Sequence, residues 1–416
     1  MPVDKLKVGL YVDLNLKWTE HPFLFKRFRI KQQWEIDTIK ELGLETVTVH
    51  PKRSLIEREK LAEDANTAPE QENDQTGTTS AEALWQHKRE KIEEARKYRD
   101  ERRRLMREYK ETTQRVRRLT SDLSEAPANA MRDAHEIVNH MAAHFEQQES
   151  VLMNLVNLPD DGYSTHAHSL NVTVLALGLA RSVGISGDEL REIALGALLH
   201  DLGMATLPGK ITLKTGAFNE QEQKLYELHA ARGGKLARQV GALDERIIEI
   251  IERHHHMLDG TGFPPTELKP ETISRATRVV TIANIYDNLC NPRQASAALP
   301  PKQAMAVLYK RHQNQLDPEL LAHFIKSMGV YPPGTIVRLS DSSIGLVVTV
   351  NPDNILKPMV LIYNPDIPRN ESLMMDLAQR DDITVDDALK PSEYPVRIYE
   401  HLGLKERLGY FYSSGH

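Results

Sequence analysis

Cysteine is almost absent from this chain of 416 residues, which contains one, Cys290. A lone cysteine excludes an internal disulfide, which is typical of proteins kept in a reducing compartment. It also has no second thiol with which to chelate a metal. Because Cys290 lies in an apolar helical pattern, we expect a small buried residue and not a nucleophile.

Long apolar runs and a strong net charge are missing as well. No stretch approaches the roughly 18 apolar residues of a membrane helix, and the start, MPVDKLKVGLYVDLN, lacks the features of a secretory signal. We therefore expect a cytoplasmic protein without a membrane span. The net charge of −6 excludes a general attraction to nucleic acid polymers, so any phosphate site must carry its positive charge locally. No phosphate-binding glycine loop, dinucleotide fingerprint or Ser-His-Asp order is present.

The chain divides into segments that differ in composition and hydrophobic pattern, and its length suits two or three domains. Residues 1–65 mix β-branched runs with the helical pattern QQWEIDTIKELG, which predicts a small α+β domain. Residues 66–80 are poor in large apolar side chains and indicate a flexible linker. Successive apolar helix faces over residues 127–330 predict an all-α domain. Alternating β-branched runs over residues 331–416 predict a small β-rich tail.

Residues 81–126 are predicted to form a charged helical connector. Between 81 and 119 one narrow apolar seam follows a three-four spacing, broken at two positions; it consists of Ala95, Tyr98, Leu105, Tyr109, Val116 and Leu119. Such a seam is typical of a helix that pairs with another helix, and it predicts a homodimer through residues 81–119. The stretch ERRRLMRE is an alternative signal for nucleic acid. Its basic residues are interleaved with acidic ones, which favours a solvated face.

Seventeen histidines are present, and several lie in the helical segments together with an aspartate. The candidate ligands are His168, His200, Asp201, His229, His254 and His255. Imidazole and carboxylate together suit Fe, Mn or Zn, whereas all-oxygen ligand sets suit Mg or Ca. The sequence therefore predicts a transition-metal site, and the number of ligands fits two ions.

The segment IALGALLHDLG is the most informative. An apolar helix ends here at His200 and Asp201, two groups that are costly to bury unless they are paired or coordinate a metal. An isolated His-Asp pair is more often a solvated helix end. The other candidate ligands favour coordination in this chain.

The segment IIERHHHMLDGTGFPP runs from three histidines directly into a glycine-rich turn. The glycines end the helix and allow a backbone to approach a ligand closely. A simple polar helix end is the alternative, but it does not account for the turn and the Phe263-Pro264 that follows. His140 and His144 lie four residues apart in an amphipathic pattern, and we expect them to be structural or exposed.

Taken in order, the segments STHAHSLNV, LLHDLG, LHAARGGKLA, HHHMLDGTGFP and ANIYDNLCNPR resemble the successive motifs of the HD-GYP family over residues 150–330. The segment LKVGLYVDLNLKWTEHPFLFKRFRI resembles a small domain of unknown function that often precedes HD-GYP domains in bacteria. The resemblance implies the α-helical HD fold. It also implies metal-dependent hydrolysis of the signalling molecule cyclic di-GMP to linear pGpG, and sometimes on to GMP.

The resemblance assigns roles to individual residues. It implies metal ligands at His168, His200, Asp201, His229, His254, His255 and Asn284. Asp201 and His200 would be the catalytic pair, and Arg293 would contact the substrate phosphate. The implied cofactors are two divalent transition metal ions, Fe or Mn first, with Zn, Ni, Co or Mg as alternatives.

Several positions depart from the family pattern. Met204 replaces a lysine and removes a cation from the phosphate pocket. Phe263 replaces the tyrosine of the name motif, and His256 replaces a glutamate. Asn284 replaces a metal-binding aspartate with an uncharged oxygen donor, so we expect metal to be held less tightly. Ser164 replaces a glutamate found in members with three metals, which favours two.

These departures leave alternatives open. The first is a phosphodiesterase of reduced strength, and the second is a cyclic di-GMP sensor or partner-docking protein with little turnover. The third alternative is a hydrolase that acts on a different nucleotide. The glycine turn that ends in Phe-Pro argues against this alternative. Asp287, one helical turn after Asn284, is expected to compensate for the lost charge or to cap local structure.

Overall fold

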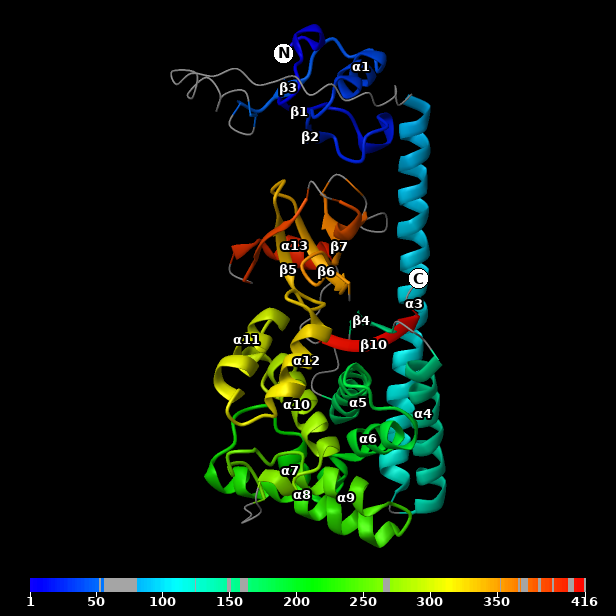
Figure 1. The fold of residues 1–416 in the computed structure, drawn as a ribbon, viewed down its shortest axis with the longest axis vertical. Helices are drawn as coiled ribbons and strands as arrows, with labels where there is room; N and C mark the ends of the chain where they lie inside the picture. Colours follow the sequence, from blue (N-terminus) through cyan, green and yellow to red (C-terminus); the bar gives the residue numbers. More distant parts are fainter. Residues whose placement is uncertain are drawn as a thin grey trace. The chain divides into compact units, whose positions relative to one another are not determined.

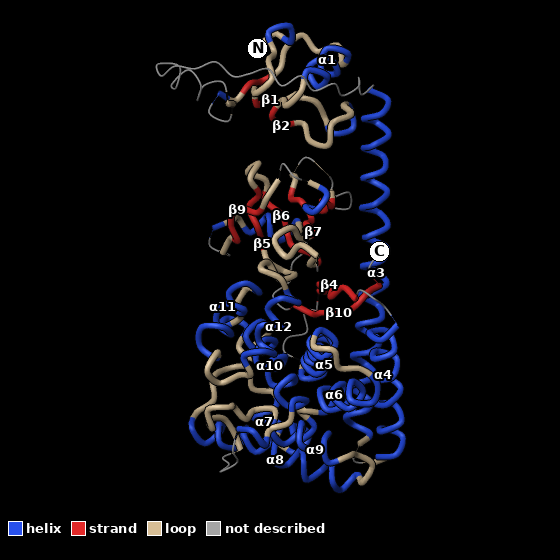
Figure 2. Tube along the Cα trace, in the orientation of Figure 1, coloured by secondary structure: helices blue, strands red, loops and turns tan. Residues whose placement is uncertain are grey.

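The computed structural model forms two compact units, which are described separately (Figures 1 and 2). The first contains residues 1–98 and 364–373, and the second contains residues 99–363 and 374–416. The residues that the structure describes are 1–51, 54–55, 81–123, 125–147, 151–157, 164–264, 270–351, 353–365, 367, 373–380, 383–390, 393–402 and 408–414. The predicted linker at residues 66–80 lies outside them.

The first unit has a small α+β core at its N-terminal end. An antiparallel sheet of order β2-β1-β3 is formed by β1 (Tyr11–Asp13), β2 (Arg27–Arg29) and β3 (Thr48–Val49), and it is accompanied by α1 (Gln33–Glu41) and the 3-10 turns Val3–Lys5 and Trp18–Glu20. Ile36 and Ile39 of α1 pack with Val12 of β1 in one apolar cluster. The helix buries one face because its apolar residues recur at three-residue intervals. The predicted α+β fold of this region is confirmed.

Helix α3 (Ala81–Asp122) contributes residues to both units. In the second unit, four residues of its predicted seam are at most 3% exposed: Leu105, Tyr109, Val116 and Leu119. The side chains of Ala95 and Tyr98 lie outside those described. The homodimer prediction assumed an open seam, but from Leu105 onward the chain itself covers it. The homodimer stays a prediction, and this part of the apolar seam does not support it.

A helical body makes up most of the second unit. Its helices are α4 (Pro127–Gln147), α5 (Thr165–Ser182), α6 (Gly187–Leu199), α7 (Gly209–Thr212), α8 (Glu220–Val240), α9 (Glu245–Arg253), α10 (Arg275–Cys290), α11 (Pro301–His312) and α12 (Pro318–Met328), with short 3-10 turns η4 (Leu202–Thr206), η5 (Pro270–Thr272) and η6 (Ala295–Ala297). Helix α5 is apolar on nearly every side because it packs against α6, α10 and α12 (Figure 1). The predicted helical fold of this region is confirmed, apart from one strand.

One strand interrupts the region that was predicted to be entirely helical. Strand β4 (Val151–Asn157) pairs antiparallel with β10 (Leu408–Ser414), near the end of the chain. The run VLMNLVN is short, apolar and partly β-branched, which suits a strand as well as a helix. Its partner is distant in sequence, so the local pattern did not reveal the pairing.

The remaining strands form an antiparallel sheet of order β8-β7-β6-β5-β9. The strands are β5 (Ile336–Leu339), β6 (Ile344–Thr349), β7 (Met359–Tyr363), β8 (Met374–Asp376) and β9 (Val385–Ala388), followed by α13 (Val396–His401), with the turn η8 (Leu377–Gln379) between β8 and β9. Val337, Val347 and Val360 are fully buried in this sheet. Figure 2 shows these strands as a group, separate from helices α5 to α12 of the same unit. The predicted β-rich C-terminal region is confirmed.

None of the described helices has the length and apolar character needed to cross a bilayer.

Candidate metal centre

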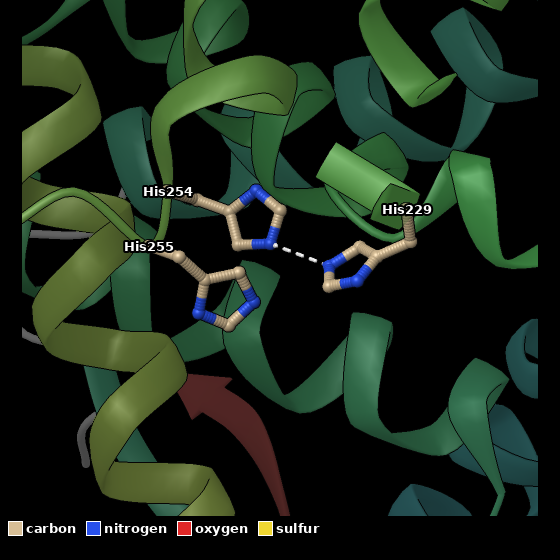
Figure 3. Close-up of side chains that lie close together, drawn as sticks. All are labelled: His229, His254 and His255. Carbon is tan, nitrogen blue, oxygen red and sulfur yellow. Dashed lines mark hydrogen bonds between the residues drawn. The ribbon is translucent and has the colours of Figure 1, made fainter. Parts of the chain in front are cut away.

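The predicted ligands converge from separate helix ends and turns. His168 lies in α5, His200 directly follows α6, Asp201 precedes η4, His229 lies in α8, and His254 and His255 follow α9. They form two groups, and within each group the ligand atoms lie within 4.8 Å of one another: His168, His200 and Asp201 in the first, and His229, His254 and His255 in the second. Figure 3 shows His229 facing His254, with His255 beside them.

Asp201 lies between the two groups. Its Oδ1 is 3.8 Å from Nε2 of His200 in the first group, and 3.3 Å from Nε2 of His229 in the second. The same oxygen is 4.0 Å from Nε2 of His254. One carboxylate is therefore within reach of both groups, as a bridging ligand must be.

The backbone fixes the tautomer of three of these imidazoles. Each Nδ1 faces the carbonyl oxygen three residues earlier: His200 faces Ala197 at 2.7 Å, His229 faces Tyr226 at 2.7 Å, and His254 faces Ile251 at 2.9 Å. Because a carbonyl oxygen only accepts, Nδ1 must carry the proton and donate it. Each neutral ring therefore directs the lone pair of Nε2 toward the centre, which is the form that binds metal.

Two pairs of these Nε2 atoms come unusually close. The distance is 3.3 Å between His229 and His254, and also 3.3 Å between His168 and His200. Facing lone pairs repel unless a cation or a shared proton lies among them. Burial lowers the pKa of His200 to about 4 and holds the pKa of His254 well below its usual value, which disfavours a proton on either of these two rings. The donor set therefore fits bound cations.

The charges at the centre support the same assignment. Burial by itself would raise the pKa of the Asp201 carboxyl, but the neighbouring His200 and His229 hold this pKa below its usual range. Asp201 is therefore an anion, although it is buried. A buried carboxylate requires positive charge nearby, and divalent metal ions held by these ligands would supply it.

Asp287 orients the first histidine of the centre. His168 donates from Nδ1 to Oδ2 of Asp287 at 2.6 Å, and Asp287 is fully buried. Burial alone would lower the pKa of His168, but the hydrogen bond and charge of Asp287 raise it. A more basic imidazole is a stronger metal ligand. Asp287 thus acts on the ring of His168, and the two roles expected for it from the sequence stay predictions.

Asn284, the predicted neutral ligand, lies beside the first group. Its Oδ1 is 3.0 Å from Nε2 of His168. The same oxygen accepts a hydrogen bond from Nδ2 of Asn288 at 2.7 Å, which keeps the amide oxygen on this side. The structure therefore brings an oxygen donor, but no charge, to the position of the missing aspartate.

Two glycines allow the backbone segments of the centre to approach one another. A Cβ on Gly203, in η4, would lie 1.8 Å from the carbonyl oxygen of His229, so η4 and α8 pack this closely only with glycine there. A Cβ on Gly262 would lie 2.0 Å from the carbonyl oxygen of His255, and Gly262 has a φ of +97°. His256, which replaces the family glutamate, pairs with Gly262 and places Nε2 2.5 Å from the carbonyl oxygen of Pro264. It therefore holds the turn.

The predicted phosphate contact Arg293 lies near the second group. Its Nη1 donates to the carbonyl oxygen of Ile211 at 3.0 Å, and its Cζ lies 5.2 Å from the ring centre of Tyr226. The Tyr226 ring is in turn 4.8 Å from the ring of His229. Tyr226 was not predicted to be functional, because one aromatic residue on a helix carries no signal in the sequence. Burial and the charge of Asp201 raise its pKa, so it remains a neutral phenol.

An apolar cluster occupies the position of the family lysine. Met204 is 5% exposed and packs with Leu207 and Ile211, and Phe218 and Tyr226 lie against the same cluster. Phe263, in place of the name-motif tyrosine, stacks on His255 with ring centres 4.1 Å apart. The departures from the family pattern thus add apolar surface around the second group.

The remaining sequence expectations concern residues away from the centre. His140 is exposed on α4 and His144 is half-buried there, and neither belongs to the two ligand groups among the described residues. Cys290 is a buried free cysteine, as expected. Ser164 caps the start of α5 by accepting a hydrogen bond from the backbone N–H of Ala167 at 3.2 Å.

Comparison with known proteins agrees with this architecture. Residues 1–134 match a family described as a domain of unknown function (DUF3391), and residues 150–320 match the HD domain family. A cyclic di-GMP phosphodiesterase of Pseudomonas aeruginosa is 27% identical over 385 residues, which is 87% of this chain and 84% of that protein.

Two further relatives match over shorter lengths. The cyclic di-GMP phosphodiesterase response regulator RpfG of Xanthomonas campestris is 33% identical over 34% of this chain and 37% of its own length. The 3'3'-cGAMP-specific phosphodiesterase 3 of Vibrio cholerae is 31% identical over 40% of this chain and 36% of its own length. The chain therefore combines a segment that matches DUF3391 with a later segment that matches the HD domain family, and it is similar to cyclic di-GMP phosphodiesterases.

Proposed function

We propose that the chain is a metal-dependent phosphodiesterase that hydrolyses cyclic di-GMP to linear pGpG, and to GMP when the second ester is also cleaved. The observation that carries the proposal is the position of Asp201, whose Oδ1 lies within 4.0 Å of imidazole nitrogens in both ligand groups. A carboxylate shared in this way suits two closely spaced cations. The named activities of the relatives support this choice of reaction.

The ligand groups divide the binding of the two ions. One ion would be held by His168, His200 and Asn284. The other would be held by His229, His254 and His255, and Asp201 would be a ligand of both. When bound, divalent cations neutralise phosphodiester oxygens and lower the pKa of a water molecule to supply the nucleophile. Mixed nitrogen and oxygen donors favour Fe or Mn over Mg.

The surrounding residues orient these ligands and the substrate. The carbonyl oxygens behind His200, His229 and His254 keep the Nε2 lone pairs directed inward. Arg293, held by the carbonyl oxygen of Ile211, offers a cation at the edge of the centre for a substrate phosphate. Positioning of this kind is the main contribution of protein side chains to phosphodiester hydrolysis by metals.

The direct test uses protein purified without air, loaded with Mn²⁺ or Fe²⁺ and incubated with cyclic di-GMP. We expect linear pGpG in the chromatogram, and a loss of at least about 100-fold in rate for Asp201→Ala. The matched control is His140→Ala, which removes an exposed histidine of α4 and should leave the rate unchanged. Full activity of Asp201→Ala would refute the proposal. Faster cleavage of 3'3'-cGAMP would instead change the assigned substrate.

A second function, cyclic di-GMP sensing with little turnover, is favoured by one observation. Met204, at the position of the family lysine, is buried in an apolar cluster and offers no charge to a phosphate. A sensor would bind cyclic di-GMP tightly in the same metal-loaded sample and yield no product. Binding measured by calorimetry beside the product assay separates the two functions.

A further inference from the structure

A line of buried hydrogen bonds joins helix α3 to the metal centre. The hydroxyl of Tyr109 donates to Oδ1 of Asn171 at 2.9 Å, and Nδ2 of Asn171 donates to Oδ1 of Asp287 at 2.9 Å. The other carboxylate oxygen, Oδ2, accepts from Nδ1 of His168 at 2.6 Å. All four side chains are at most 4% exposed. Hydrogen bonds thus connect helices α3, α5 and α10 to one candidate ligand, His168.

The direction of every hydrogen bond in this line is determined by the carboxylate. Asp287 only accepts, so Asn171 must present its NH₂ group to Asp287 and its oxygen to Tyr109. Tyr109 must then be the donor in its contact with Asn171. The Tyr109 hydroxyl has a second acceptor, the backbone carbonyl oxygen of Ala167 at 3.3 Å, but the side chain of Asn171 is the nearer one. A buried line of this kind holds its members in place more strictly than packing alone, because a lost partner is not replaced by water.

We propose that Tyr109 is a positioning residue for the metal centre, and that α3 influences metal binding through it. The proposal rests on the metal site of the proposed function, but it concerns residues that are not ligands. Residues of α3 before Arg99 belong to the first unit. A shift or rotation of α3 would move the Tyr109 hydroxyl, and with it Asn171, Asp287 and the ring of His168. The line therefore gives helix α3 a physical route to the first ligand group.

The structure also limits the size of the effect. Asp287 accepts a second hydrogen bond at Oδ1, from Nδ2 of Asn291 at 2.8 Å, and this donor does not depend on α3. Loss of the Tyr109 hydroxyl should therefore loosen the orientation of His168 without removing it. Partners behind a metal ligand typically affect metal affinity by about 10- to 100-fold. We expect the lower end of this range for Tyr109→Phe.

The experiment measures Mn²⁺ affinity of the full chain by competition with a fluorescent chelator. Tyr109→Phe should raise the Kd for the weaker-bound ion about 10-fold, and it should change the visible spectrum of Co²⁺-loaded protein, which reports ligand geometry. The matched control is Val116→Ala, which removes buried methyl groups from the same helix without touching the line. It should lower the melting temperature and leave the Mn²⁺ affinity and the Co²⁺ spectrum unchanged.

A second variant tests the line itself. Asn171→Ala should weaken Mn²⁺ binding, and the double variant Tyr109→Phe with Asn171→Ala should be no weaker than Asn171→Ala alone, because both changes break one connection. Additive effects, or wild-type affinity in Tyr109→Phe, would overturn the proposal. Wild-type protein that binds no Mn²⁺ would instead show that the proposed function itself has failed.

Discussion

One oxygen of Asp201 lies 3.3 Å from Nε2 of His229, although the two residues belong to different ligand groups. Under the proposed function, Asp201 would serve both ions, whereas His168 and His229 would each serve one. We predict that His168→Gln and His229→Gln each retain about one metal ion per chain, and that Asp201→Asn retains fewer than either. Metal content of dialysed protein, determined by mass spectrometry, checks this. Equal metal content in all three variants would contradict it.

Restoring the family carboxylate should strengthen metal binding. Oδ1 of Asn284 already lies 3.0 Å from Nε2 of His168, so Asn284→Asp adds a negative charge without requiring a new position for the side chain. We predict metal affinity about 10-fold higher, because an anionic oxygen is a better ligand than an amide. Chelator competition with Mn²⁺ measures it. Asn314→Asp, which adds the same charge at an exposed position, is the control and should bind as the wild type does.

The glycine turn after the histidine run provides a matched pair of variants. A Cβ at Gly262 would lie 2.0 Å from the carbonyl oxygen of His255, whereas at Gly260 nothing lies within 4 Å. Both have positive φ, so alanine at either should cost about 1–2 kcal/mol of backbone strain. We predict that Gly262→Ala also loses metal from the second group because His255 must move. Comparable metal loss in Gly260→Ala would show that strain, and not the clash, is responsible.

A buried lysine in the first unit predicts a pH effect on stability. Lys88 is 2% exposed and donates from Nζ to the carbonyl oxygen of His21 at 2.7 Å, and burial lowers its pKa to about 8. Between this value and the ordinary pKa near 10.5, the unfolded chain binds more protons at this position than the folded chain does. The free energy of unfolding should therefore rise with pH across that window, by up to about 3 kcal/mol.

The variant Lys88→Met removes this dependence. All three tryptophans of the chain, Trp18, Trp34 and Trp85, belong to the first unit, so their fluorescence reports its unfolding in urea. Between pH 8 and pH 10 the unfolding free energy of the wild type should rise relative to that of Lys88→Met. A difference that does not change with pH would show that Lys88 is charged in the folded protein.

The convergence of the candidate ligands could be predicted because chemically unusual residues stand next to one another. His200 and Asp201 end an apolar helix, and His254 and His255 precede a glycine turn. Burying such polar groups costs free energy unless a metal or another partner binds them. The sequence also revealed the helical body and the β-rich C-terminal region, since each depends on local periodicity. The shared position of Asp201 between the groups is a tertiary distance, and spacing along the chain does not contain it.

The features that escaped prediction depend on contacts between distant segments. Tyr109 was assigned to a pairing seam because spacing alone does not distinguish a residue that packs from one that also donates a hydrogen bond. Nothing in the sequence pattern marks Asn171, which lies in an apolar helix, as a functional residue. Tyr226 became a candidate only through its contacts with His229 and Arg293 in the structure. The pairing of β4 with β10 likewise joins segments of the second unit that lie far apart in the sequence.

The central claim, that two cations share Asp201, is tested most directly by anomalous X-ray scattering from a crystal of the Mn²⁺-loaded protein. The account predicts two peaks, one within coordination distance of His168 and His200 and the other within coordination distance of His229, His254 and His255. Asp201 should lie within coordination distance of both peaks. A single peak, or two peaks of which only one is near Asp201, would contradict it.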